Sequence, residues 1–275
     1  MPEVSTNTES PAAPLSDAEL LAQTKLAVRA AGLALRGRFT VEMPYTTVEE
    51  TMAALHANDE AVLKILGPRL SQLRPEARWV EDEFAGGALP AGEWWLVDPV
   101  EGNLNHVHGM PEFAVTATLV RENEPVFTVV HLPMTGETYT ALAGGGAFLD
   151  GRPLRVSGKS SLALGIVATS QARPGQDEET LRTVGSSITR MLLGALVVRV
   201  SVAATLHLLN VAAGRMDAFW QYSGTRADLL PGALLVSEAG GRVTDAGGRT
   251  WTSESESFLA AAPNLHGQAV AALAG

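Results

Sequence analysis

Hydrophobic positions recur at helical spacing over two stretches near the start of this 275-residue chain. In residues 16–36 and again in residues 47–73, apolar side chains return every three or four positions, as on the buried face of a helix. The first stretch opens with Ser16-Asp-Ala-Glu19, the spacing of a capping box, in which the two side chains satisfy backbone N–H groups at a helix start. We therefore predict two amphipathic helices.

Beyond Pro75 the pattern changes to short apolar runs separated by glycine and proline, which favours strands. These runs predict a mostly antiparallel sheet, and they cover residues 78–80, 94–97, 113–120, 126–132 and 138–142. From about residue 162 the two kinds of stretch alternate, with strands expected at 166–169, 196–200 and 242–244 and helices at 178–187, 203–213, 228–239 and 264–274. The alternation predicts an α/β fold built from packed layers.

The composition narrows the class of protein. Hydrophobic residues make up 46% and charged residues 18% of the chain, which is typical of a globular enzyme. The net charge is −10 and no basic cluster occurs, which argues against nucleic-acid and anionic-membrane partners. The absence of cysteine excludes disulfides, thiolate zinc sites and a cysteine nucleophile. No apolar stretch is long enough to span a membrane, and residues 1–14 lack the order of a signal peptide, so we predict a disordered tail and a cytoplasmic location.

Two carboxylates directly follow the apolar run at residues 94–97. They lie in the sequence Asp98-Pro99-Val100-Glu101-Gly102. The proline fixes φ and lacks a backbone donor, and the glycine permits a sharp bend. We therefore expect both carboxylates and the Val100 carbonyl to converge at a strand end. Mg²⁺ prefers an oxygen cluster of this kind.

Other candidate residues have an ordinary interpretation beside the functional one. The acids of Glu81-Asp82-Glu83 are typical of a solvated turn, and Asp228 has the position of a helix-capping or first-turn acid. His106 and His108 have a strand-like spacing that suits a transition metal, although metal binding is the less favoured interpretation. Arg226 is either a surface arginine or a contact for an anionic substrate.

Residues 98–103 resemble the first signature of the inositol monophosphatase family, Asp-Pro-hydrophobic-Asp-Gly-Thr. The segment 226–232, followed by Glu238-Ala-Gly-Gly, resembles the second signature of that family. Segments 129–157 and 210–220 are similar to the family as well, and the matching segments together run from about residue 47 to residue 262.

The resemblance implies an α/β (α+β) fold, a layered α-β-α-β-α sandwich of the inositol monophosphatase/fructose-1,6-bisphosphatase type, usually assembled as a homodimer. It divides the chain into residues 15–160, with the N-terminal helices, the antiparallel sheet and the first metal motif, and residues 161–275, with the second motif. Family members hydrolyse phosphomonoesters with Mg²⁺, so the resemblance implies a small phosphorylated polyol, sugar or nucleoside as substrate.

Site residues carry over by position. The implied metal ligands are Asp82, Asp98, the Val100 carbonyl, Glu101 and Asp228, with Glu81 or Glu83 in place of Asp82 if the alignment shifts by one residue. Asn103 and Asp59 are expected to position the attacking water. The expected substrate contacts are Gly102, Asn103 and Leu104, because a helix start after Gly102 offers backbone N–H groups to phosphate, and also Gln221 and Arg226.

Four of these positions depart from the family pattern, and one of them is Gln221, which stands where some members have a substrate-binding glutamate. Glu101 replaces an aspartate, Asp82 replaces a glutamate, and Asn103 replaces a threonine whose hydroxyl helps to activate water. An amide holds a water but does not relay a proton as a hydroxyl does. The longer Glu101 and the shorter Asp82 either compensate each other around a shifted metal or reflect decay of the active site. The hypotheses are therefore a phosphatase, an enzyme of this fold diverted to other chemistry, and a catalytically silent homologue.

Overall fold

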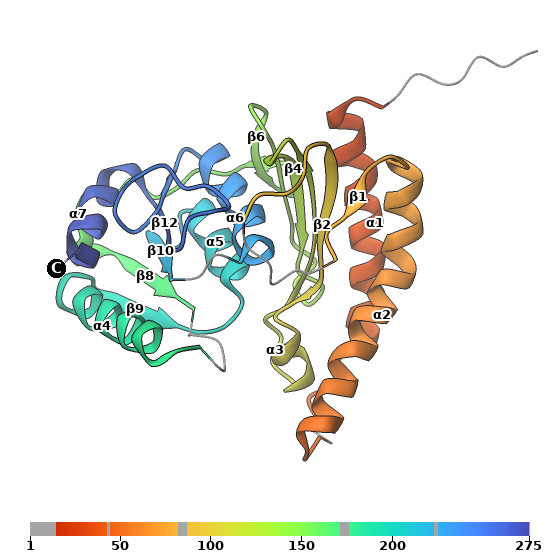
Figure 1. Cartoon of the computed structure of the whole chain (residues 1–275), viewed down its shortest axis with the longest axis horizontal. Helices are drawn as coiled ribbons and strands as arrows, with labels where there is room; N and C mark the ends of the chain where they lie inside the picture. The colour runs from red at the N-terminus through yellow and green to blue at the C-terminus, as the bar shows by residue number, and fades with distance from the viewer. Residues whose placement is uncertain (1–14, 43–44, 82–86, 171–175, 223–224, 275) are drawn as a thin grey trace, which may run out of the picture.

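Five layers of alternating helices and sheets make up the molecule (Figure 1). This computed structural model describes residues 15–42, 45–81, 87–170, 176–222 and 225–274, so the tail predicted at residues 1–14 lies outside the described residues. Helices α1 and α2 cover one face of the first sheet, α5 and α6 lie between the two sheets, and α4 and α7 cover the outer face of the second sheet (Figure 1). The layered α-β-α-β-α fold predicted from the sequence is confirmed.

The two N-terminal helices begin at capping boxes. In α1 (Asp17–Arg38) the Ser16 backbone N–H donates to the Glu19 carboxylate over 2.8 Å, and the Glu19 N–H donates back to the Ser16 hydroxyl over 3.3 Å. Thr47 and Glu50 make the same exchange at the start of α2 (Val48–Leu73). These caps satisfy donors that the first turn leaves without helical partners. The apolar faces of both helices pack on the first sheet.

The first sheet has seven strands in sequence order, and all neighbours are antiparallel except the first pair. Its strands are β1 (Arg78–Trp79), β2 (Glu93–Glu101), β3 (Ala114–Arg121), β4 (Glu124–His131), β5 (Thr138–Leu142), β6 (Gly146–Leu149) and β7 (Arg152–Pro153). Side chains alternate between its faces: Val115 and Leu119 join the core beneath α1 and α2, whereas Ala114 joins the core beneath α5 and α6.

The second sheet has five strands in the order β11-β12-β10-β8-β9. Its strands and the remaining helices are β8 (Ile166–Thr169), α4 (Glu178–Gly194), β9 (Val197–Val200), α5 (Ala204–Ala212), β10 (Ala218–Gln221), α6 (Arg226–Glu238), β11 (Arg242–Thr244), β12 (Phe258–Ala261) and α7 (Pro263–Ala274), with a short 3₁₀ turn at Leu162–Leu164. Strand β9 forms one edge of this sheet and pairs in parallel with β8.

Sequence analysis missed several short elements. It did not predict β10 or β12, and it ended α4 at residue 187 although the helix continues to Gly194. Strand β10 consists of four buried residues inside a longer apolar stretch, where hydrophobic periodicity does not separate a short strand from a helix end. The extra turns of α4 contain exposed leucines, which break the amphipathic pattern.

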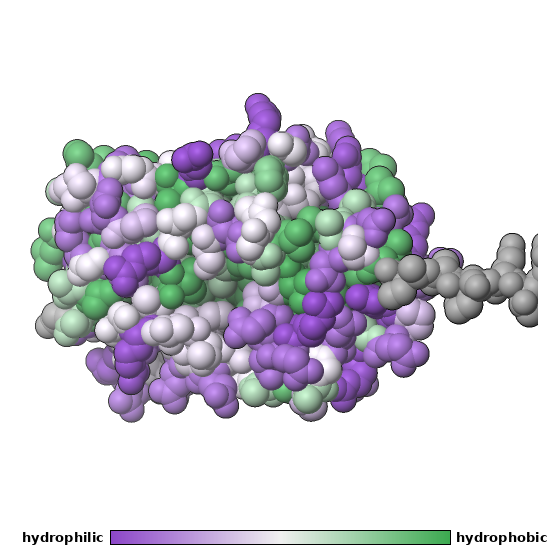
Figure 2. All heavy atoms as spheres, turned by 90° about the horizontal axis from the view of Figure 1, so that it is seen from above, coloured by the Kyte–Doolittle hydropathy of each residue, from purple (hydrophilic) through white to green (hydrophobic). Residues whose placement is uncertain are grey.

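The face drawn in Figure 2 interleaves hydrophilic and hydrophobic residues. None of the described helices combines the length and the apolar character that crossing a bilayer requires.

The predicted boundary at residue 160 lies in the connection between β7 and β8. The division into two halves remains a prediction.

Candidate functional site

A β-bulge places Asp98 and Glu101 on the same face of the first sheet. Residues three apart in a regular strand point to opposite faces. Here Asp98 pairs with Thr116 and Glu101 pairs with Ala114, so three steps along β2 correspond to two steps along β3. The extra residue restores the alignment of the two carboxylates. Both side chains therefore point toward α5 and α6.

The chain turns sharply directly after Glu101. Gly102 has φ of 81°, a left-handed conformation, and a Cβ there would lie 2.8 Å from the Glu112 carbonyl oxygen. The five-residue helix α3 (Asn103–Val107) begins after this glycine. Asn105 secures the turn, because its side-chain amide donates to the same carbonyl over 2.7 Å.

The third carboxylate comes from the first turn of α6. Asp228 is brought to the sheet by close packing of α5 against α6, where Gly232 leaves no space for a Cβ beside Leu208. The Thr205 hydroxyl of α5 lies 3.0 Å from a Glu101 carboxylate oxygen and 3.0 Å from the Asp228 backbone carbonyl. Thr205 thus links Glu101 to the turn that carries Asp228.

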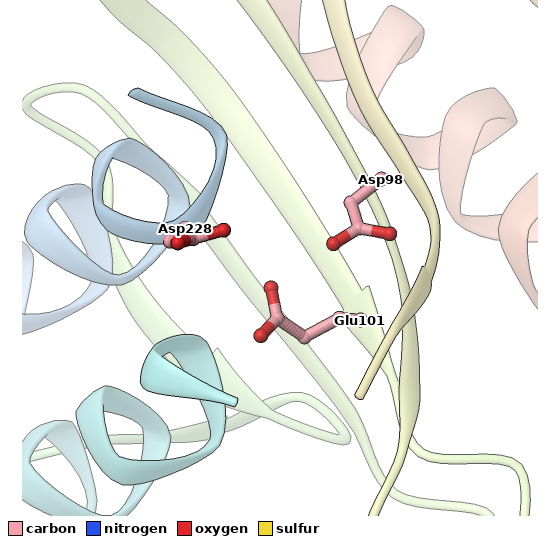
Figure 3. A group of neighbouring side chains, drawn as sticks. All are labelled: Asp98, Glu101 and Asp228. Atoms are coloured by element: carbon pink, nitrogen blue, oxygen red, sulfur yellow. The ribbon is translucent and has the colours of Figure 1, made fainter. Parts of the chain in front are cut away.

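Asp98, Glu101 and Asp228 form one carboxylate cluster. Each offers an oxygen, and these three oxygens lie within 4.8 Å of one another (Figure 3). Glu101 is 3% exposed. Burial raises the pKa of Glu101 well above its usual range, and the negative charges of Asp98 and Asp228 raise it further. A divalent cation fits this arrangement, because it would offset the repulsion among three close carboxylates, of which Glu101 is buried and Asp98 and Asp228 are partly buried.

Asn103 and Asp59 form a second polar group beside α3. The Asn103 side-chain amide donates to the Asp59 carboxylate over 2.9 Å and to the Leu55 carbonyl over 3.1 Å. Burial raises the pKa of Asp59 to about 6, although the charge of His56 and the hydrogen bond from Asn103 favour the ionised form. The two residues predicted to position water are therefore in direct contact.

The other predicted residues lie in different surroundings. Leu104 is exposed in the first turn of α3, and Gln221 is buried at the end of β10, where its side-chain oxygen accepts a hydrogen bond from Ser170. Arg226 is the first residue of α6. Asp82 lies outside the described residues.

The prediction that His106 and His108 lie in a strand-like segment is wrong. His106 is in helix α3 and His108 is its C-terminal cap, and two residues along a helix correspond to a rotation of about 200°, so the side chains diverge. His106 is buried, whereas His108 is exposed and contacts the Leu104 carbonyl. The pair does not form a metal site.

Sequence analysis missed three residues that support the site. Thr205 is a buried polar residue in a helix of mostly apolar residues, a signal that could have marked it as a contact for a polar group. Asn58 is buried and contacts Asn103 over 3.0 Å, and Arg38 contacts Asn58 over 2.9 Å. Neither contact has a short-range sequence signal, since Arg38, Asn58 and Asn103 lie far apart from one another in the chain.

The layered fold, with a carboxylate cluster at the end of β2, is typical of α/β enzymes whose sites are built from acidic side chains. A sequence profile of the inositol monophosphatase family matches residues 16–275. The chain belongs to this family, and it is accordingly a hydrolase of the phosphatase type.

Known relatives are similar over most of the chain. An inositol-1-monophosphatase of Rhizobium meliloti is 41% identical over 193 residues, which cover 69% of this chain and 71% of that protein. The inositol monophosphatase 2 of Homo sapiens is 32% identical over 232 residues, or 82% of this chain and 80% of that protein. The solved inositol monophosphatase of Anabaena superposes with a TM-score of 0.79 at 25% identity, covering 94% of this chain and 96% of the other.

Proposed function

We propose that the protein is a Mg²⁺-dependent phosphomonoester hydrolase that acts on an inositol phosphate or a similar small polyol, sugar or nucleoside phosphate. The carboxylate cluster of Asp98, Glu101 and Asp228 carries the proposal, because three acidic oxygens within 4.8 Å suit a hard divalent cation. The names of the relatives support an inositol phosphate as the first substrate to test.

The proposed roles follow from position. The three carboxylates hold the metal together with the Val100 carbonyl and, from outside the described residues, Asp82. When bound, the metal supplies positive charge that offsets the phosphate and favours ionisation of the attacking water. Asp59 accepts the proton of that water, and Asn103 holds the Asp59 carboxylate in place.

Substrate contacts are proposed at two places. The backbone N–H groups of Gly102, Asn103 and Leu104 meet the phosphate, since first-turn N–H groups lack partners within their own helix. Gln221 and Arg226 lie at the ends of β10 and α6, and we assign them to the organic part of the substrate.

One observation favours diverted chemistry as a second candidate. Asn103 donates its side-chain amide to two protein acceptors, Asp59 and the Leu55 carbonyl, and it offers no hydroxyl for proton relay. An enzyme of this fold could then use the same metal site on an acidic small molecule and release a product other than phosphate.

Phosphate release separates the two candidates. The assay uses a panel of inositol, sugar, nucleotide and histidinol phosphates, with Mg²⁺ or Mn²⁺ and with a chelator as control. We expect cation-dependent release of phosphate from at least one polyol or sugar ester. A folded protein that binds the cation and releases no phosphate from any member would favour the second candidate.

The rate is expected to fall on the acid side with a midpoint near the pKa of Asp59, about 6. Because the carboxylate form accepts the proton, activity is present above this pKa and is lost as Asp59 becomes protonated below it. The measurement is kcat against pH for the wild type and for Asp59→Asn. The variant should be slower by about a hundredfold and should lose this midpoint. A wild-type midpoint unchanged in Asp59→Asn would contradict the role.

We also propose that the protein is a cytoplasmic homodimer, joined at the end of α4 and the adjoining edge strand β9. Four apolar side chains are exposed there: Leu192, Leu193, Leu196 and Val197. Exposed apolar groups beside a strand that forms the edge of a sheet among the described residues favour association with another protein surface. A second copy of the chain is the proposed occupant.

Leu193→Glu is expected to convert the dimer to a monomer, because Leu193 is 86% exposed and a charge there would be buried in the dimer. The matched control is Leu33→Glu, which changes a 65% exposed leucine on α1. Light scattering after gel filtration measures the mass. A monomeric wild type, or a Leu193→Glu variant that still forms dimers, would contradict the proposed interface.

A further inference from the structure

A branched set of hydrogen bonds connects α1 to the Asn103 side chain. The Arg38 Nε donates to the Asn58 Oδ1 over 2.9 Å. The Asn58 Nδ2 then lies 3.0 Å from the Asn103 Oδ1 and 3.0 Å from the His106 Nδ1. Asn58 and His106 are buried, at 3% and 4% exposed, so water does not readily replace the contact between them, whereas Arg38 reaches Asn58 from the surface.

The guanidinium fixes the direction of every bond in this set. A guanidinium only donates, so the Asn58 oxygen must accept from Arg38 and the Asn58 nitrogen must face Asn103 and His106. The Asn103 oxygen is then the acceptor, and its nitrogen faces Asp59 and the Leu55 carbonyl, as observed.

His106 must adopt one tautomer under the same rule. Its Nδ1 accepts from Asn58, so the proton is on Nε2, which faces the Leu35 carbonyl over 3.4 Å. Burial lowers the pKa of His106, the contact with the Leu35 carbonyl opposes this, and the charge of Arg38 lowers the pKa further, so the surroundings favour the neutral ring.

We infer that Arg38 and Asn58 are positioning residues that orient the Asn103 amide toward Asp59. The inference rests on the proposed phosphatase function only for its kinetic consequence. Removing Arg38 allows the Asn58 amide to reverse, which would turn its oxygen against the oxygen of Asn103. Asp59 and the Leu55 carbonyl still attract the Asn103 nitrogen, so the loss is partial.

Nitrogen NMR of labelled histidine tests the orientation without any need for activity. The chain has six histidines, and His106→Gln identifies the His106 signals. We expect the Nε2–H tautomer in the wild type and a change toward a mixture in Arg38→Met. The control Arg36→Met removes an exposed arginine from the same helix end and should leave the tautomer unchanged. An unchanged His106 tautomer in Arg38→Met would overturn the inference.

Kinetics tests the consequence for Asn103. We expect Arg38→Met to lower kcat for phosphate release about tenfold with little change in KM, because the reacting groups are misaligned while substrate binding is kept. Arg38→Lys, which retains a donor-only group, should recover most of the rate. An equal loss in Arg38→Lys and Arg38→Met would overturn the inference. A wild type without phosphatase activity but with the expected tautomers would refute the proposed function alone.

Discussion

Replacing Asp98 or Asp228 with asparagine is expected to reduce phosphate release by about a thousandfold or more while the fold remains intact. The loss corresponds to roughly 4 kcal/mol of barrier, the scale of effect that a bound metal ion supplies. A neutral amide is a much poorer ligand for Mg²⁺ than a carboxylate. Stability should not fall, because each change relieves repulsion within a group of three carboxyl groups that lie close together.

Steady-state phosphate release measures the predicted loss of activity, and thermal unfolding without metal measures the predicted unchanged stability. Glu256→Gln is a suitable control, since it neutralises an exposed carboxylate away from the cluster and should leave the rate unchanged. Full activity in both Asp98→Asn and Asp228→Asn would rule out the proposed role of the cluster.

Shortening Glu101 to the aspartate of the family signature is expected to lower activity, by a factor of about ten to a hundred. The structure explains the longer side chain, because the Glu101 carboxylate reaches the Thr205 hydroxyl over 3.0 Å. Glu101→Asp moves the carboxylate by more than about 1 Å and breaks this contact, and loss of such a supporting contact typically costs ten- to a hundredfold in metal affinity or activity.

Thr205 variants provide the matched comparison for this prediction. Thr205→Val removes the hydroxyl at nearly constant shape and should weaken Mg²⁺ binding, whereas Thr205→Ser keeps the hydroxyl and should retain it. Both are measured by calorimetric titration beside the kinetic assay. A Glu101→Asp variant faster than the wild type would show that Glu101 is a sign of decay and not of compensation.

Much of the fold could be predicted because its signals are local. The capping box at Ser16 and Glu19, the helical periodicity of α1 and α2 and the short apolar runs of the first sheet all depend on neighbouring residues. Strands β10 and β12 lacked such signals, since each is a four-residue buried run whose partners come from distant segments.

The candidate site was predictable in part for the same reason. The run from Asp98 to Gly102 indicated a bend with two carboxylates, and the resemblance to the family indicated Asp228. The bulge that aligns Asp98 with Glu101 depends on the register against β3, which the strand itself does not specify. The contacts of Thr205 and Asn58 arise only when distant helices pack together.

The most direct test of the central claim is anomalous diffraction from crystals soaked in manganese. The proposed mechanism predicts an anomalous peak bounded by the carboxylates of Asp98, Glu101 and Asp228 and the Val100 carbonyl, and no such peak in crystals of Asp98→Asn. Wild-type crystals that diffract well at millimolar manganese and show no peak at this position would contradict it.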